Sequence, residues 1–227
     1  MIFMLSIMKI TGNFLFAKIL IPLAILLSVS FFNQAGRLAA QQRGRFTDPR
    51  DGKVYQTVKV GNQWIMAENL AYKPEVGKFW VYNNDPANLS KYGYLYDWET
   101  ANQIAPAGWH LPSRNEWVTF RKSLGGKRAV WKYSAMIFKP VIDGGGSGFD
   151  ALLGGIVDCK GNFKFLGERA EFWSATNSNF DGPWHFDVVR ASTPVPYGDE
   201  VSNAGGFASL KSYECLESGK SVRLFKD

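Results

Sequence analysis

The chain has 227 residues, 46% of them hydrophobic and 15% aromatic, with a formal net charge of +6 at pH 7. Its basic residues do not form a stripe interleaved with aromatic side chains, so we expect no nucleic-acid partner. Two cysteines are too few for a disulfide-dense scaffold, and the HExxH and CxxC spacings of zinc sites do not occur.

The first 40 residues have the pattern of a secretory signal peptide. They contain no acidic residue, and Lys9 and Lys18 precede an apolar run from Ile19 to Phe32. Small residues follow the run, and we expect cleavage near Ala39-Ala40. The run is shorter than the ~20 apolar residues that a membrane-spanning helix needs, and an uncleaved anchor is the alternative.

The start of translation is open between Met1, Met4 and Met8, because the leader from Met1 is longer than usual. Removing residues 1–40 leaves 23 Lys and Arg against 20 acids, so the net charge falls to +3. We therefore expect a mature chain that keeps no stable membrane span and is secreted, periplasmic or attached to the cell surface.

The rest of the chain is predicted to be a linker, residues 41–47, followed by one domain, residues 48–227. Residues 54–60 alternate in the manner of a half-buried strand, and residues 64–70 return after a short turn, which predicts a β-hairpin. Residues 71–91 are long for a connection, which indicates a functional loop or a lid.

Two helices are predicted next. The first has Trp98 and Ala101 on its inner face and ends at Ala105-Pro106. The second begins after the stretch from Gly108 to Trp117, in which Ser113 and Glu116 form an S-x-x-E capping box.

The inner face of the second helix carries Trp117, Phe120 and Leu124, and Gly125-Gly126 ends the helix. We expect Trp109 and Trp117 to lock the turn before this helix by packing on the same core.

From residue 149 onward the pattern changes to short strands separated by turns. The predicted strands are 149–157, 163–166, 171–175, 184–189, 207–211 and 222–225. This spacing is typical of an antiparallel sheet. Strands at both ends of the domain and two helices between them predict an α+β fold.

Several of these stretches also resemble a known family. "DPRDGKVYQTVKVGNQWIMAENLAY", "YGYLYDWETANQIAPAGWHLPSRNEW", "GGIVDCKGNFKFLGERAEFWSAT" and "SVRLFKD" are similar to the Fibrobacter succinogenes major paralogous domain, over residues 48–227. The resemblance implies a secreted or surface-attached domain of Bacteroidota with no established activity. It also implies a C-type-lectin-like fold, with two helices packed on twisted antiparallel sheets and long loops.

The Gly-Trp-His-Leu-Pro stretch followed by a Glu-Trp helix also resembles formylglycine-generating, sulfatase-modifying enzymes, which are similar to that fold. The chain departs from the family at its cysteines. Ala105 and Leu224 stand where the family commonly has Cys. Cys159 and Cys215 remain, and in an oxidising compartment we expect them to form a disulfide.

Candidate catalytic residues are few. His110 lies within the turn before the second helix, where we expect a buried, hydrogen-bonded structural role, and His185 is the other imidazole. A hydrolase would need two carboxylates as general acid and base. Four acids could supply them, although we favour the interpretation that they are surface charges: Glu168, Glu171, Asp181 and Asp187.

A calcium site is considered at Asn177, Asn179 and Asp181, whose side-chain oxygens alternate in one loop. These residues and Trp184 are our candidate ligand-binding set. No EF-hand pattern follows, and no Glu-Pro-Asn or Gln-Pro-Asp triplet of sugar-binding C-type lectins occurs, so we expect no metal and no cofactor.

These observations favour a non-catalytic recognition module for a glycan, a peptide or a partner protein outside the cytoplasm. Two alternatives stay open, a hydrolase that uses paired carboxylates and a purely structural surface subunit. Two acids within ~5–10 Å across a cleft would favour the hydrolase.

Overall fold

The structure is a computed structural model. It describes residues 41–125, 133–134, 136–178, 181–191, 195–197, 200–202, 205–212 and 215–227. The expected signal peptide, residues 1–40, and Asn179 lie outside the described residues. In the described part of the chain, no helix is long and apolar enough to cross a membrane.

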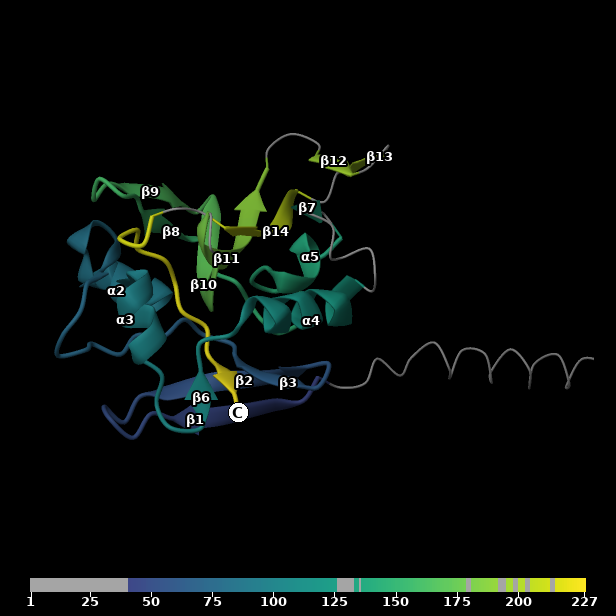
Figure 1. The fold of residues 1–227 in the computed structure, drawn as a ribbon. Helices are drawn as coiled ribbons and strands as arrows, with labels where there is room; N and C mark the ends of the chain where they lie inside the picture. The colour runs from purple at the N-terminus through teal and green to yellow at the C-terminus, as the bar shows by residue number, and fades with distance from the viewer. Residues whose placement is uncertain are drawn as a thin grey trace, which may run out of the picture. The chain divides into compact units, whose positions relative to one another are not determined.

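The first sheet joins the two ends of the described chain (Figure 1). Its strand order is β1 (Arg43–Thr47), β2 (Val54–Val60), β3 (Gln63–Met66), β15 (Phe225–Lys226) and β6 (Trp109–His110), and all pairs are antiparallel. The predicted hairpin is confirmed as β2 and β3.

The segment expected to be a linker, 41–47, differs from the expectation because it contains β1. β1 pairs along its whole length with β2. It also places the Phe46 ring 4.9 Å from the ring of Trp109, so apolar packing holds a stretch whose polar composition suggested a linker.

The second sheet has six strands, in the order β7 (Tyr133–Ser134), β14 (Gly206–Ser212), β11 (Gly182–Arg190), β10 (Arg169–Ser178), β8 (Gly154–Val157) and β9 (Phe163–Leu166). Only the β8–β10 contact within this described sheet is parallel. Two short pairs complete the strands: β4 (Phe79–Trp80) with β5 (Leu95–Tyr96), and β12 (Val195–Tyr197) with β13 (Glu200–Ser202).

The described residues form four α-helices: α2 (Pro86–Tyr92), α3 (Trp98–Gln103), α4 (Arg114–Gly125) and α5 (Phe138–Val141). α3 and α4 are the two predicted helices, and the α+β class is confirmed.

The prediction of one long loop over 71–91 is wrong. This stretch contains β4, a 3-10 turn (Tyr82–Asn84) and α2. Asp85 caps α2 by accepting a hydrogen bond from the Ala87 amide, and Pro86 suits the first helical position.

Two aromatic cores fill the domain. Trp117 lies between the two large sheets, with its ring 4.8 Å from that of Phe186 in β11 and 5.0 Å from that of Phe225 in β15. Trp109 belongs to a second core with Tyr55 and Tyr96. Trp109 and Trp117 therefore do not share a core, and that expectation is wrong, because the turn between them passes from one core to the other.

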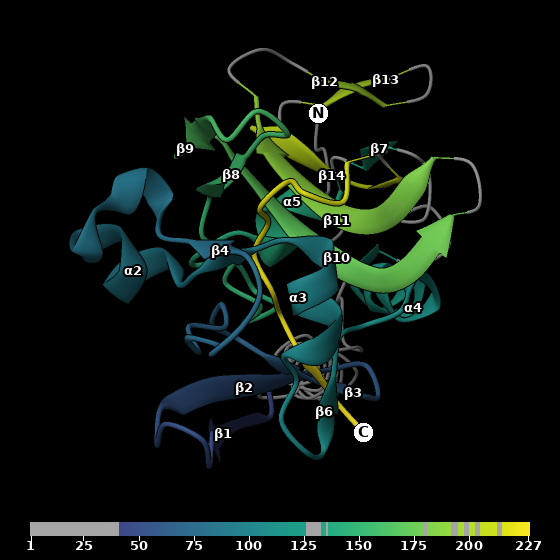
Figure 2. The ribbon, with the colours of Figure 1, turned by 60° about the vertical axis from the view of Figure 1, so that its left-hand side comes forward.

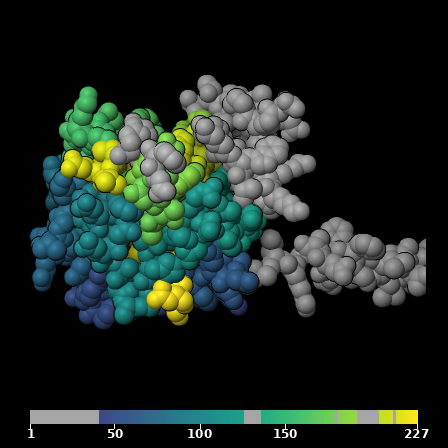
Figure 3. All heavy atoms as spheres, in the orientation of Figure 1, coloured from purple at the N-terminus to yellow at the C-terminus, as the bar shows by residue number. Residues whose placement is uncertain are grey.

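The C-terminal segment runs past both sheets (Figure 2). Its backbone carbonyls accept hydrogen bonds from amides of earlier elements. The carbonyl of Lys220 accepts from the Tyr96 amide, that of Ser221 from Trp173, that of Val222 from Leu70 and that of Leu224 from Met66. In Figure 3 this segment, in yellow, reaches the surface both beside the green strands and beside the blue N-terminal sheet.

Arg223 is fully buried in this segment. Its guanidinium donates to Asn69 Oδ1 and to the carbonyls of Met66, Phe149 and Asp150. Burial lowers the pKa of Arg223 to about 9, yet its guanidinium has four acceptors, which tie the segment to β3 at Met66 and to the residues before β8 at Phe149 and Asp150.

Candidate functional site

The turn before α4 contains the expected capping box. The Ser113 hydroxyl accepts from the Glu116 amide at 3.3 Å, and Glu116 Oε2 accepts from the Ser113 amide at 2.7 Å. The other carboxylate oxygen of Glu116, Oε1, lies 2.7 Å from His110 Nε2. The carboxylate that caps the helix therefore also contacts His110.

His110 lies between two carboxylates. Its Nδ1 is 2.6 Å from Asp227 Oδ1, while its Nε2 faces Glu116. Burial alone would lower the pKa of His110, but the hydrogen bonds to Asp227 and Glu116 raise it above its ordinary value. The side chain is 35% exposed, so the expectation of a buried histidine is wrong; His110 lies on β6, which is an edge strand of its sheet.

The second candidate lies on one face of the six-stranded sheet. Along β10 the side chains of Arg169 and Glu171 alternate with the core residues Ala170 and Phe172. Along β11, His185 and Asp187 alternate with Phe186 and Val188 in the same way. Glu171 is the register partner of Asp187, and successive side chains of a strand lie on opposite faces of the sheet. The four polar residues therefore lie together on one face.

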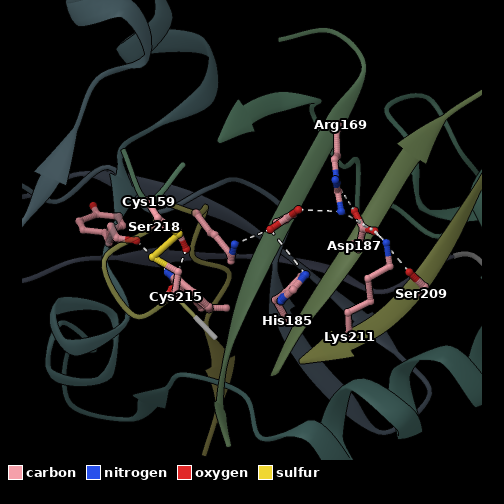
Figure 4. A network of polar contacts seen from close by, with 12 residues as sticks. Cys159, Arg169, His185, Asp187, Ser209, Lys211, Cys215 and Ser218 are labelled. Atoms are coloured by element: carbon pink, nitrogen blue, oxygen red, sulfur yellow. Dashed lines mark hydrogen bonds and ion pairs between the residues drawn. A yellow bond between two sulfur atoms is a disulfide. The ribbon is translucent and has the colours of Figure 1, made fainter. Parts of the chain in front are cut away.

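These polar residues form a network of ion pairs, which Figure 4 shows from close by. Arg169 Nε lies 2.7 Å from Asp187 Oδ1, and its Nη2 lies 2.8 Å from Glu171 Oε1. Lys211 Nζ on β14 is 2.8 Å from Asp187 Oδ2, and the Ser209 hydroxyl donates to the same oxygen at 3.4 Å. Each carboxylate therefore has at least two cationic or hydroxyl partners.

Glu171 has a further partner in Lys220, whose ammonium donates to Oε2 from the C-terminal segment. Burial of Glu171 would raise its pKa, but Lys220, His185 and Arg169 lower it well below its ordinary value. The carboxylate is thus held ionised at neutral pH.

His185 is 2% exposed, and its Nε2 lies 3.5 Å from Glu171 Oε2. Burial lowers the pKa of His185 to about 4, so the imidazole is neutral at pH 7. Its Nδ1 is buried and has no hydrogen-bond partner in the described part of the chain. Such an unsatisfied buried group is rare in folded proteins and requires an explanation.

A cavity of about 1230 Å³ opens at this network. Its lining includes His185 and Trp184, which are neighbours in β11 and therefore lie on opposite faces of the sheet. We use "charged cleft" for the part of this cavity around the ion-pair network, and define it by these lining residues: Asp158, Cys159, Lys160, Lys164, Phe165, Arg169, Glu171, His185, Lys211, Ser218 and Lys220.

One rim of the charged cleft is held by Cys159 and Cys215, which form a disulfide in the structure with their Cα atoms 6.1 Å apart. This distance is in the normal range for a bridge. The disulfide links the turn after β8 to the segment that delivers Ser218 and Lys220 (Figure 4). It therefore joins two segments that both contribute lining residues to the cleft.

Two members of the candidate ligand-binding set line this cavity outside the charged cleft. Asn177 and Asp181 are exposed near the end of the β10–β11 hairpin, and the Asp181 amide donates to the Ser178 hydroxyl. Trp184 is half-buried, with the Arg114 guanidinium 4.4 Å from its ring centre. Trp184 and Asp181 line the same cavity, but Trp184 does so from the face opposite His185.

The four acids considered for a hydrolase separate into two groups. Glu168 and Asp181 are exposed, as expected. For Glu171 and Asp187 the expectation of surface charges is wrong, because both are buried among cations. Among the described residues, no group of three or more His, Cys, Asp and Glu is arranged to hold a metal ion.

A family model for the Fibrobacter succinogenes major domain matches residues 58–224. The chain belongs to this family. No match was found among curated proteins or among solved structures. In this Fibrobacter succinogenes major domain, both the His110–Glu116 turn and the charged cleft lie within the matched residues.

Sequence reasoning missed Arg169, Lys211 and Lys220, which supply the cations of the charged cleft. A signal for Arg169 was present, because charged residues at alternate positions in strands that are otherwise apolar indicate a polar sheet face. No such pattern marks Lys220, since it lies outside any long strand and reaches Glu171 only in the folded chain.

Proposed function

We propose that this chain is an exported, non-catalytic recognition module whose ligand binds in the charged cleft. The observation that supports the proposal is the ion pairing of the two buried carboxylates. Glu171 and Asp187 are each held in ion pairs by cations, while Arg169 and Lys211 remain partly exposed to the cleft. Such an arrangement presents fixed positive charge to a ligand.

The ion pairs argue against the hydrolase alternative. Hydrolysis by paired carboxylates needs one of them protonated at the working pH, so that it can act as a general acid. Lys220 and Arg169 stabilise the ionised form of Glu171. Glu171 is therefore not in the protonated form that a general acid needs.

Export is proposed from the leader sequence and from the disulfide, which persists in oxidising compartments. A C-type-lectin-like fold is proposed from the family resemblance, and the two helices α3 and α4 packed with mostly antiparallel sheets support it. The ligand is an extracellular glycan or protein, and we propose no resident cofactor.

The test is a binding screen of the purified protein against immobilised glycans and surface proteins, with ligand breakdown followed in parallel. We expect saturable binding without turnover. Lys211→Ala should weaken binding at least fivefold, whereas Lys73→Ala, an exposed lysine outside the cleft, should not. Turnover of the ligand, or equal binding by both variants, would contradict the proposal.

A further inference from the structure

We propose that the charged cleft recognises an acidic sugar, with the acid group on the exposed cations and a hydroxyl group on His185. This inference deepens the proposed function and depends on it. Three features of the described residues support it: the excess of cations, the unpartnered nitrogen of His185 and the exposed ring of Phe165.

The first feature is charge. Five cations line or enter the charged cleft: Lys160, Lys164, Arg169, Lys211 and Lys220. Three acids face them, since Asp158 pairs with Lys164, and Glu171 and Asp187 pair with the inner cations. Among the described residues the cleft therefore keeps two excess positive charges, which favour an anionic ligand.

An unused hydrogen-bond donor on Arg169 makes the preference for an anionic ligand more specific. Arg169 uses Nε and Nη2 for Asp187 and Glu171, and its Nη1 has no hydrogen-bond partner among the described residues. The side chain is 22% exposed. A charged donor of this kind makes stronger hydrogen bonds to a carboxylate or a sulfate than to a neutral group.

The second feature is the nitrogen of His185. With Glu171 beside Nε2, a neutral imidazole carries its proton on Nε2, which leaves Nδ1 as an acceptor. An acceptor cannot bind an anion, but it can accept a hydrogen bond from a hydroxyl group. The cleft thus favours a ligand that carries both an acid group and a hydroxyl donor, and an acidic sugar has both.

The third feature is Phe165 on β9. Its side chain is 41% exposed at the cleft, and its ring centre lies 5.7 Å from the Arg169 guanidinium. Its φ of 65° is in the left-handed region, which bulky residues rarely occupy. The ring is thus exposed at the cleft, where the apolar face of a sugar ring can pack on it.

The same backbone argues against an acidic peptide. A peptide would bind most simply by adding a strand to a free sheet edge, and β9 is an edge strand. The left-handed residues Phe165 and Gly167 interrupt the extended backbone that strand addition requires. A sugar needs no such edge.

The experiment measures binding of the purified protein to four probes by titration calorimetry: an oligogalacturonate, its methyl ester, its O-acetylated form and polyglutamate. A sulfated oligosaccharide is a fifth probe, which separates sulfate from carboxylate. We expect the methyl ester and polyglutamate to bind at least tenfold more weakly than the best acidic sugar. The O-acetylated form, which keeps charge but loses hydroxyl donors, should bind at least threefold more weakly.

Two variants test the geometry. Phe165→Gly suits the left-handed backbone, so it should fold normally and lose at least fivefold in affinity. Arg169→Lys keeps the charge but removes the Nη1 donor, and should also lose affinity. Lys73→Ala is the control and should bind normally.

The outcomes separate this inference from the proposed function. Binding of a neutral glycan or a protein in the cleft, with no binding of acidic sugars, would overturn the inference and leave the recognition module standing. Equal binding of polyglutamate would replace the sugar with a peptide. Absence of any ligand for the cleft would overturn both.

Discussion

At the scale of single residues, the contact between His110 and its two carboxylates has a consequence for pH. The pKa of His110 is raised in the folded chain. A raised pKa contributes stability that is fully present below the unfolded value of about 6.5 and is lost as pH rises through the folded value. Glu116, whose pKa is lowered, stays ionised across this range.

We therefore predict that His110→Gln reduces stability more at pH 6 than at pH 9. Urea unfolding of the wild type and the variant at both pH values measures this difference. Because the side chain is about one-third exposed, solvent screens the effect. An equal loss at both pH values would show that His110 acts through its shape and not through its charge.

At the scale of elements, α4 depends on its capping box. Ser113→Ala removes the hydroxyl that accepts from the Glu116 amide, and should reduce stability by about 1 kcal/mol. Ser123→Ala is the matched control, because Ser123 is an exposed serine in the same helix whose hydroxyl only bonds back to the Thr119 carbonyl. Thermal or urea unfolding should show a clearly smaller change for the control.

The anchor of α4 in the core is Trp117. It is fully buried and contacts Phe172 and Phe186 of the six-stranded sheet and Phe225 of the five-stranded sheet. Trp117→Ala should reduce stability by about 3–5 kcal/mol, because it removes a large side chain from a site that cannot collapse from either side. Trp117→Phe should lose less. A small loss in the alanine variant, measured by urea unfolding, would mean that the two sheets pack without this ring.

The elements that the sequence predicted well are those with a local signal. These signals are the hairpin turn residues, the S-x-x-E cap and the alternation of apolar and polar residues in strands. They predicted β2, β3, α4, β10 and β11. β1 was missed because its pairing with β2 and the contact of Phe46 with Trp109 are tertiary. α2 was missed because none of its residues is buried, so no apolar face reveals it.

At the scale of the whole molecule, the charged cleft assembles from separate parts of the chain. Arg169 and Glu171 come from β10, His185 and Asp187 from β11, Lys211 from β14 and Lys220 from the C-terminal segment. Their types were visible in the sequence, but their meeting depends on the sheet register, which no local pattern gives. The candidate set at the hairpin end was chosen from one loop and therefore missed them.

The Cys159–Cys215 disulfide closes a loop with a sequence separation of 56 residues. In the chain-entropy model such a bridge stabilises the fold by about 4 kcal/mol. Non-reducing peptide mapping of the purified protein should recover the bridged peptides, and Cys159→Ser with Cys215→Ser should lower the unfolding midpoint. Two free thiols after air oxidation would contradict this prediction.

The path of the C-terminal segment bears on how the chain is made. β15 completes a sheet whose first strands lie more than 150 residues earlier, and Arg223 joins that sheet to Phe149 and Asp150. Contacts between such distant residues slow folding. On the ribosome, the edge of β3 must wait for β15, and Glu171 must wait for Lys220, both of which lie at the end of the domain. The nascent domain therefore stays open, with aromatic surface to be protected, until its final dozen residues emerge.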